Sequence, residues 1–367
     1  MKRVNILLIS SEFPPGPGGI GNHSYNLAKQ LDAKGFNICV LTPRIHKPVD
    51  ENFDNSHSFI IHRYSSNAYF SPISIIIFVI KEYLKNNKYI VVASGQIPLF
   101  VTCVFLKSFI KESLGIFHGH ELSLGNKSIK YLLKQSIKNF YQIIAVSSFS
   151  KDQALSNGTF VKKIKVINNG FDIDRFNNPF IQKRSDNLRL ITLGSLSYRK
   201  GQHNVIKALP RLIQYYDDVH YDMVGEPYIM NDLKKIAQSV NVEHLVKFHG
   251  VLDDKELNKI LLASNIFIML SDNTDNGDVE GFGIAILEAN YLGLPAIGSK
   301  GCGIEDAICK GYSGELISNH NPQELIRALD RIMSDYERYS ECAIKWAKKH
   351  SWNIISDYYI NEINNLT

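Results

Sequence analysis

Short apolar runs of strand length alternate with amphipathic stretches along the chain, and this alternation begins twice. The first series contains VNILLIS, NICVLT, YIVVAS, GIFHGH, QIIAVS and KIKVINN, and the second contains LRLITLGS, VHYDMVGE, LVKFHG, NIFIMLS and LPAIGSK. Apolar runs that are separated by helices form parallel sheets covered on both faces. The sequence therefore predicts an α/β protein with two doubly wound parallel sheets.

A polar connector separates the two series and predicts where the domains join. The stretch NNGFDIDRFNNPFIQKRSDN contains a proline and several asparagines. With 367 residues, the chain is long enough for two domains that each bury a core. We expect a first domain at 1–180, a second at 181–350 and a linker near 177–187. The last helical stretch, at about 351–367, follows the second domain, and the sequence leaves open whether it packs back on the first.

The cysteine pattern and the start of the sequence predict a cytoplasmic protein. Five cysteines are scattered without a Cys-x-x-Cys pair, which predicts reduced thiols and argues against a zinc site. The start MKRVNILLIS leads directly into polar loop residues, unlike a signal peptide. The stretch YIVVASGQIPLFVTCVFL is uncharged and of borderline length for a membrane span, but SGQIP interrupts it. We expect instead a strand, a turn and a helix that begins near Pro98.

Charge is divided unevenly between the two halves of the chain. Residues 1–180 contain 21 Lys and Arg against 11 Asp and Glu, a net charge of +10, whereas the remainder has a net charge of −5. A basic first half predicts a surface that meets an anionic partner. A solvated surface without a partner explains the same charges equally well.

The stretch DVEGFGIAILEANYLGLPAIGS carries the strongest chemical signal. Glu280 precedes a Gly-Phe-Gly turn, and the apolar spacing that follows predicts a helix carrying Glu288 about two turns away. Glycines before a helix leave backbone N–H groups open to an anion such as a diphosphate. Both carboxylates can accept hydrogen bonds from sugar hydroxyls. A single Glu here would only complement the helix dipole, whereas two spaced carboxylates favour a binding site.

The stretch LGSLSYRKGQHNVIKAL predicts a second loop of the same kind. A strand is followed by Gly194, by a turn carrying Arg199 and Lys200, and by Gly201 at the start of a helix. This arrangement suits the binding of a phosphate group. A basic turn in solvent is an equal alternative for this stretch alone. Because both loops follow strands of one domain, we expect them to face the same cleft.

The glycine-rich stretch PPGPGGIGNHS contains Gly16-x-Gly18-x-x-Gly21, the spacing of a dinucleotide-binding loop. A nicotinamide enzyme needs an acidic residue at the end of its second strand, and NICVLTPR has none. In addition, SEFPP separates the first glycine from the preceding strand. We therefore interpret the match as coincidental and expect Gly19 and Gly21 to begin a helix whose backbone a ligand can approach.

Together these stretches resemble the retaining glycosyltransferases of family 4. Members typically carry E-G-F-G-x(4)-E-A, an Arg and Lys-Gly phosphate loop, a glycine-rich first loop and N-G-V-D before the linker. This sequence shows EGFGIAILEA, YRKG, GGIGNHSYNLAKQL, AVSSFSKDQA and INNGFDIDRF in the family's order, over nearly the whole chain. The resemblance implies the GT-B fold, in which two doubly wound Rossmann-like domains face a central cleft. It also implies retaining transfer of a hexose from a nucleotide sugar.

The resemblance assigns roles to individual residues. Glu288 would hold the ribose hydroxyls, Glu280 the donor sugar, and Lys200 the charge that develops on the leaving diphosphate. The donor sugar and diphosphate would also meet the backbone of Gly281, Phe282 and Gly283. At Gly19 and Gly21 we expect the backbone to be approached by the donor diphosphate or by the acceptor. The family commonly has Gly-Arg where this chain has Gly194-Ser195, so we expect Arg199 to replace the missing arginine.

The stretch GIFHGHELSLG supplies two histidines. The family often has a histidine at this strand end facing the donor sugar, and His118 matches that position better than His120. A packed histidine satisfied by the backbone is the alternative for both, and the favoured one for His120, with Glu121 as a partner.

Retention without an obvious nucleophile implies a front-face substitution, because a double displacement needs a carboxylate opposite the leaving group. Glu280 is the only motif carboxylate near enough, and its family role is to orient the sugar. No Asp-x-Asp signature follows a strand, since SDNTDNGD has a loop-like composition. We therefore expect no metal and no cofactor apart from the nucleotide sugar, which is a substrate.

Two basic and apolar stretches bear on the acceptor. NKSIKYLLKQSIKNFYQ and YFSPISIIIFVIKEYLKNNK fit helices on an anionic membrane surface and also fit ordinary packed helices. With the basic first half, they favour a lipid-linked saccharide acceptor on the inner face of the cytoplasmic membrane, and no nucleic acid. That acceptor suits surface-polysaccharide assembly, such as lipopolysaccharide O-antigen or capsule.

Alternatives remain for the donor and for the reaction. We expect a GDP-hexose such as GDP-mannose, with a UDP-hexose or UDP-N-acetylhexosamine and a soluble acceptor as the alternative. From another class, a UDP-GlcNAc 2-epimerase shares the two-domain architecture but would lack E-G-F-G-x(4)-E-A. A lectin-like or scaffold protein would have no need of paired carboxylates beside a phosphate loop.

Overall fold

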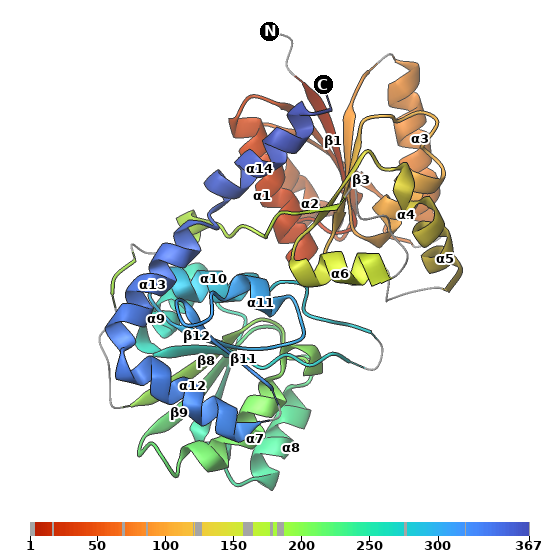
Figure 1. The fold of residues 1–367 in the computed structure, drawn as a ribbon. Coiled ribbons are helices and arrows are strands. Elements are labelled where there is room, and N and C mark those ends of the chain that lie inside the picture. Colours follow the sequence, from red (N-terminus) through yellow and green to blue (C-terminus); the bar gives the residue numbers. More distant parts are fainter. Residues whose placement is uncertain are drawn as a thin grey trace. The chain divides into compact units, whose positions relative to one another are not determined.

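The computed structural model describes residues 4–16, 18–67, 70–85, 87–119, 121, 127–156, 164–176, 179–181, 187–274, 277–319 and 321–366. The chain forms two compact units (Figure 1). Unit 1 contains Met1–Gly170 and Trp352–Thr367, and unit 2 contains Phe171–Ser351. The chain thus changes unit at Gly170/Phe171, before the expected boundary at 180/181. The expected linker at 177–187 falls largely outside the described residues.

Unit 1 is built on a seven-stranded parallel sheet with the order β3-β2-β1-β4-β5-β6-β7. Its strands are β1 (Asn5–Ser10), β2 (Asn37–Pro43), β3 (Ile60–Tyr64), β4 (Ile90–Ser94), β5 (Ser113–Phe117), β6 (Gln142–Ala145) and β7 (Ile164–Val166). Its helices include α1 (Gly19–Ala33), α2 (Lys47–Asp54), α3 (Phe70–Leu84), α4 (Gln96–Val104), α5 (Lys127–Ser136) and α6 (Ser148–Ser156). The strand order reverses between β1 and β4, so the loops that follow these strands border the usual ligand crevice of such a sheet.

The C-terminal helix α14 (Trp352–Asn364) belongs to unit 1, where it packs against α1 (Figure 1). Gly170, the last residue before the chain enters unit 2, lies against the indole of Trp352. A Cβ atom at this position would come within 2.8 Å of Trp352 Cδ2, so a larger residue would displace the helix. The helix therefore closes a unit whose other elements come from the first 170 residues.

Unit 2 repeats the same architecture with a six-stranded parallel sheet of order β10-β9-β8-β11-β12-β13. Its strands are β8 (Leu188–Leu193), β9 (Val219–Val224), β10 (Val246–Gly250), β11 (Ile266–Met269), β12 (Ala296–Ser299) and β13 (Gly314–Ile317). Its helices are α7 (Gln202–Leu212), α8 (Met230–Ser239), α9 (Asp254–Ala263), α10 (Ile284–Tyr291), α11 (Ile304–Ala307), α12 (Pro322–Ser334) and α13 (Tyr336–Lys348). The order reverses between β8 and β11, and the two motif loops of this unit follow these strands.

These sheets confirm the predicted fold class. The central strands β1, β4, β8 and β11 are apolar and almost entirely buried, because helices cover both faces of each sheet. The uncharged stretch after Lys88 forms β4 and then α4, which begins at Gln96, close to the expected start at Pro98. Within the described residues, no helix is both long enough and apolar enough to span a bilayer.

Candidate active site

The loop after β8 places Lys200 over the end of the strand. Gly194 follows β8 with a φ of 135°, and a Cβ atom there would lie 3.2 Å from Lys200 Cε. A short 3₁₀ helix, η4 (Tyr198–Lys200), begins at Ser197, whose side chain accepts a hydrogen bond from the Lys200 amide. Gly201 then adopts a left-handed φ of 75°, and any side chain there would overlap the carbonyl oxygen of Leu270 after β11. Local geometry thus holds Lys200 between the ends of β8 and β11.

Glu280 is the centre of a nearly buried charge cluster. Its Oε2 atom lies 2.8 Å from Lys200 Nζ and also accepts a hydrogen bond from Arg199 Nη1. Arg199 Nε donates to Asp278 Oδ2 at 3.1 Å. Burial by itself raises the pKa of Glu280, but the charges of Lys200 and Arg199 and a hydrogen bond from the Phe282 amide lower that pKa to about 2. Glu280 is therefore ionised at neutral pH and can only accept hydrogen bonds.

The Glu280–Gly283 loop is held in place by the start of α11. The Gly303 amide donates to the Glu280 carbonyl at 2.8 Å, and a Cβ atom on Gly303 would overlap the carbonyl oxygen of Gly281. Gly283 has a φ of 93° and directly precedes α10. Because this conformation favours glycine, the Gly-Phe-Gly sequence is what allows the helix to begin here.

Glu288 lies on α10 and pairs with Arg175. Its carboxylate is 7% exposed, and its Oε1 atom lies 2.9 Å from Arg175 Nη1. The same guanidinium reaches Asp254 Oδ1, with Nη2 at 2.7 Å. Burial raises the pKa of Glu288, and the opposing effects of Arg175 and Lys200 only partly offset that rise. Since the charge of Lys200 acts on both Glu280 and Glu288, these residues form one electrostatic cluster.

In unit 1, His118 lies directly after β5 and is held by a buried polar network. Its Nε2 atom lies 2.9 Å from the Ser94 hydroxyl at the end of β4. The buried carboxylate of Glu121 accepts hydrogen bonds from the amides of His118 and Gly119, at 2.8 and 3.0 Å. The strand end and the carboxylate together fix the backbone and the ring of His118. His120 lies outside the described residues.

The glycine-rich loop of unit 1 leads into α1, which begins at Gly19 as expected. Gly19 is exposed, and a Cβ atom there would meet nothing within 4 Å. At Gly18, in contrast, a Cβ atom would overlap Glu12 Oε2, which also accepts a 3.4 Å hydrogen bond from the Gly21 amide. The start of α1 thus has a carboxylate of its own at Gly18 and Gly21, and open backbone only at Gly19.

Comparison with known families covers both units. The family described as "Glycosyltransferase Family 4" matches residues 17–175, and "Glycosyl transferases group 1" matches residues 174–349. This chain belongs to glycosyltransferase family 4. The glycosyltransferase therefore has the GT-B fold that its motifs imply, and Anabaena HepE, solved with UDP and glucose, shares this fold. That structure superposes with a TM-score of 0.76 at 20% identity, over 99% of this chain and 100% of HepE.

Two relatives align with most of this chain at low sequence identity. The amylovoran biosynthesis glycosyltransferase AmsK of Erwinia amylovora is 24% identical, over 80% of this chain and 72% of the relative. A GDP-mannose-dependent α-(1-6)-phosphatidylinositol monomannoside mannosyltransferase of Mycobacterium tuberculosis is 22% identical, over 91% of this chain and 90% of the relative. The glycosyltransferase is thus similar to enzymes that act in polysaccharide and glycolipid synthesis.

The structure adds three charged residues to the expected set. Arg175 and Asp254 surround Glu288, and Asp278 holds Arg199 beside Glu280. Arg175 lies in the INNGFDIDRF motif, whose resemblance to the family assigned no role to this arginine. Arg199, which we expected to replace the arginine missing at Ser195, places its guanidinium against Glu280.

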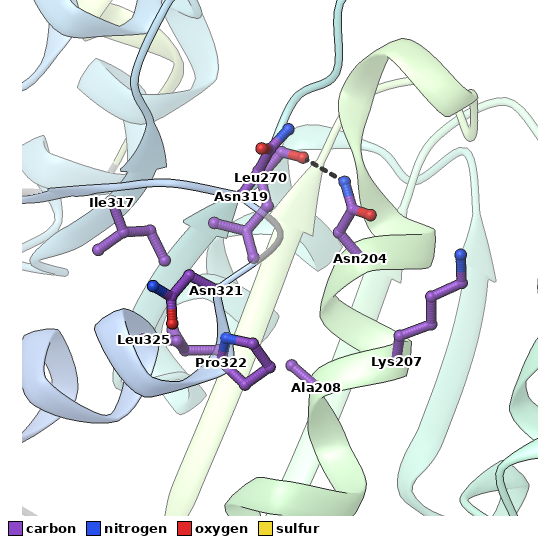
Figure 2. A pocket seen from close by; sticks show the side chains of 9 residues that line it. All are labelled: Asn204, Lys207, Ala208, Leu270, Ile317, Asn319, Asn321, Pro322 and Leu325. Carbon is purple, nitrogen blue, oxygen red and sulfur yellow. Dashed lines mark hydrogen bonds between the residues drawn. The ribbon is translucent and has the colours of Figure 1, made fainter.

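A separate cavity of about 130 Å³ lies beside the first turns of α7 and α12 in unit 2 (Figure 2). Its walls include Asn204, which donates to the Leu270 carbonyl, and the exposed Lys207. Asn321 also lines it and caps α12 by accepting from the amides of Gln323 and Glu324. None of the predicted site residues lines this cavity, so we do not assign the donor to it. Among the described residues, no group of three His, Cys, Asp or Glu has the geometry of a metal site.

Proposed function

We propose that the protein is a retaining hexosyltransferase that transfers a sugar, preferably from GDP-mannose, to a lipid-linked saccharide in cell-surface polysaccharide synthesis. The observation that carries the proposal is the pair of cations on one buried carboxylate, Lys200 and Arg199 on Glu280, at the reversal point of a parallel sheet. Such a cluster offers a leaving diphosphate two positive charges and offers a sugar one fixed acceptor.

The proposed chemistry divides the work among these residues. Glu280 accepts a hydrogen bond from a donor-sugar hydroxyl, while Glu288 accepts hydrogen bonds from the ribose. Lys200 and Arg199 move part of their interaction from Glu280 to the diphosphate as its negative charge grows. Charge stabilisation that increases towards the transition state raises turnover, not only binding.

The departing diphosphate oxygen takes the proton of the acceptor hydroxyl, so that the new bond forms on the face from which the old one leaves. No protein carboxylate acts as nucleophile, and no metal or cofactor takes part. We further assign His118 to a hydroxyl of the donor sugar, and the backbone of Gly19, Gly281, Phe282 and Gly283 to the donor sugar and diphosphate. Gly21, whose amide donates to Glu12, is left out of this assignment.

An apolar stripe on α3 supports attachment to a membrane surface. Phe70, Ile73, Ile77 and Leu84 recur at helical spacing and are 60%, 53%, 48% and 74% exposed. Ser71, Ile75 and Val79 on the other side of the helix are buried. Exposed Lys81 and Lys85 follow the same stripe. An amphipathic helix with apolar and basic side chains partitions into an anionic bilayer interface.

Helix α5, the other candidate for the membrane surface, supports this attachment less. Leu133 is buried in the core of unit 1, as are Ile137 and Phe140 immediately after the helix. Tyr131 and Leu132 are exposed. We therefore place the lipid-binding surface on α3 and propose that the enzyme is peripheral on the inner face of the cytoplasmic membrane.

Product analysis with purified enzyme tests the proposal. The enzyme is incubated with GDP-mannose, UDP-glucose or UDP-N-acetylglucosamine and a lipid-linked saccharide fraction, with and without EDTA, and the new anomeric centre is read by NMR. The proposal expects transfer from GDP-mannose, full activity in EDTA and retained configuration. Transfer from a UDP-sugar alone would replace the donor assignment. Interconversion of a UDP-sugar without an acceptor would support an epimerase, and an inverted product would exclude the front-face mechanism.

A further inference from the structure

A second histidine, His23, lies behind His118 in the second turn of α1. The His23 side chain is completely buried, and its ring lies edge-on to the ring of His118, with centroids 5.0 Å apart and an angle of 84°. On other sides, His23 contacts the rings of Trp352 and Tyr359, with centroids 5.0 and 5.6 Å away. His23 thus connects the C-terminal helix α14 to the candidate site residue His118.

The polar atoms of His23 are unusual for a residue that only fills the core. Its Nε2 atom lies 2.9 Å from the Tyr359 hydroxyl, whereas Nδ1 has no hydrogen-bond partner within the part of the chain that the structure describes. Burial lowers the pKa of His23 to about 3, so the ring is neutral at physiological pH. An unsatisfied buried polar atom destabilises the fold, and an apolar side chain would avoid that cost. Stability alone therefore does not account for histidine at this position.

Three groups contact His118. Ser94 binds one ring nitrogen of His118, and Glu121 binds the backbone amides of His118 and Gly119. The edge-on contact with His23 adds a packing surface from α1 against the His118 ring. Edge-to-face ring pairs have a preferred geometry, so a change in the tilt of His23 is transmitted to the ring it contacts.

We infer that His23 is a positioning residue for His118, and that the Tyr359 hydroxyl on α14 sets the orientation of His23. The inference rests on the proposed role of His118 at the donor sugar. It assigns to α14 a function in catalysis beyond covering α1: the helix fixes the ring that orients the sugar-binding histidine.

The substitution Tyr359→Phe tests this directly, because it removes one hydroxyl and keeps the ring. A net hydrogen-bond contribution of about 0.5–1.5 kcal/mol corresponds to roughly a two- to tenfold change in rate. We expect kcat to fall by that factor, with little change in the KM for the acceptor. The neighbouring Tyr358 is 53% exposed on the same helix, so Tyr358→Phe is the matched control and should leave kcat unchanged.

A double-mutant cycle with His118→Ala separates positioning from general stability. If Tyr359 acts through His118, Tyr359→Phe lowers kcat in the wild-type background and has no further effect in His118→Ala. An equal loss of kcat in both backgrounds would show a merely structural role and overturn the inference. If Tyr359→Phe does not fold at the assay temperature, the same cycle is run with His23→Asn.

The proposed role of His118 and the inferred role of His23 can be disproved separately. Wild-type turnover by His118→Ala would remove the proposed role of His118 and, with it, the role of His23. Impaired His118→Ala together with wild-type kcat for Tyr359→Phe and His23→Asn would overturn only the inference about His23.

Discussion

Lys200 Nζ lies 2.8 Å from Glu280 Oε2, and neither side chain is more than 14% exposed. A buried ion pair of this kind contributes little net stability, because desolvation of the two charges offsets most of their attraction. Removing one partner alone, in contrast, leaves an uncompensated charge. The pair therefore suits a site in which a third charged group, the donor diphosphate, exchanges with the carboxylate.

Loss of either partner should abolish most turnover. We expect Lys200→Ala and Glu280→Ala to lower kcat by about 10²- to 10³-fold, the effect of removing one group that stabilises transition-state charge. The double variant Lys200→Gln/Glu280→Gln should regain folding stability without regaining activity, because it leaves no unpaired charge. Steady-state kinetics and urea unfolding at neutral pH measure the two effects. Wild-type-like turnover in either single variant would contradict the assignment.

Glu280 should also make stability depend on pH at the acidic end. Its pKa is about 2 in the folded protein and has an ordinary value of 4.5, so the folded state favours the ionised form. The resulting stabilisation is fully present above pH 4.5 and is lost as pH falls towards 2. We expect the stability difference between wild type and Glu280→Gln to shrink over this window. A difference that stays constant between pH 5 and 3 in urea unfolding would disagree with the assignment.

Arg175 should control donor binding through Glu288. Burial raises the pKa of Glu288, and Arg175 is the strongest influence that lowers it, so Arg175→Met should raise that pKa further. A protonated Glu288 accepts weaker hydrogen bonds from the ribose, by about 1 kcal/mol or roughly fivefold in affinity. Calorimetric titration with the donor should therefore show that binding to Arg175→Met weakens as pH falls, and does so at a higher pH than binding to the wild type. The exposed Arg211→Met is the control, and parallel pH profiles for both variants would refute the coupling.

The stripe on α3 should bind anionic vesicles. Ile73 and Ile77 are about half exposed, so burial of both in a bilayer interface contributes roughly 2 kcal/mol. We expect Ile73→Ser/Ile77→Ser to lower co-sedimentation with anionic vesicles at least tenfold and to leave activity on a soluble acceptor analogue unchanged. Ile354 on α14 is 41% exposed, and Ile354→Ser is the matched control. Equal vesicle binding by both variants would exclude α3 as the lipid-binding surface.

Two glycines near the Gly281–Gly283 loop should differ sharply when each is replaced by alanine. A Cβ atom at Gly303 would overlap the Gly281 carbonyl oxygen, whereas at Gly301 it would meet nothing within 4 Å. Gly301 has a φ of 80°, so Gly301→Ala should cost only about 1 kcal/mol of stability and keep activity. Gly303→Ala should displace the loop and lose most activity. Thermal unfolding and donor kinetics distinguish the two, and an active Gly303→Ala enzyme would show that the loop tolerates movement.

Much of the fold and part of the site could be predicted from local sequence. Short apolar runs such as NILLIS, alternating with amphipathic stretches, predict strands buried on both faces. Gly194, Gly201 and Gly283 mark the turns that place Lys200 and Glu280. The pairing of Arg175 with Glu288 could not be predicted in this way, because 113 residues separate them and only the fold brings them together. Periodicity also could not show that α3 exposes an apolar stripe, because both sides of this helix carry apolar residues and only the fold determines which side is buried.

The boundary between the units and the carboxylate at α1 show the same limit. The connector composition predicted a change of domain at 180/181, whereas the units divide at Gly170/Phe171, where Gly170 packs on Trp352 of the returning helix. Glu12 precedes the glycine-rich loop by a few residues, and its contact with Gly18 and Gly21 depends on how that loop turns back.

The return of α14 to unit 1 determines the order in which the units can be completed on the ribosome. Unit 2 is one continuous segment and can fold as soon as it has emerged. Unit 1 must wait with α1 uncovered, and with His23 lacking Tyr359, until residues 352–366 have been synthesised. The part of the chain that is made first is therefore the last to reach its native structure, and the hydrogen bond between His23 and Tyr359 can form only after unit 2 has been made.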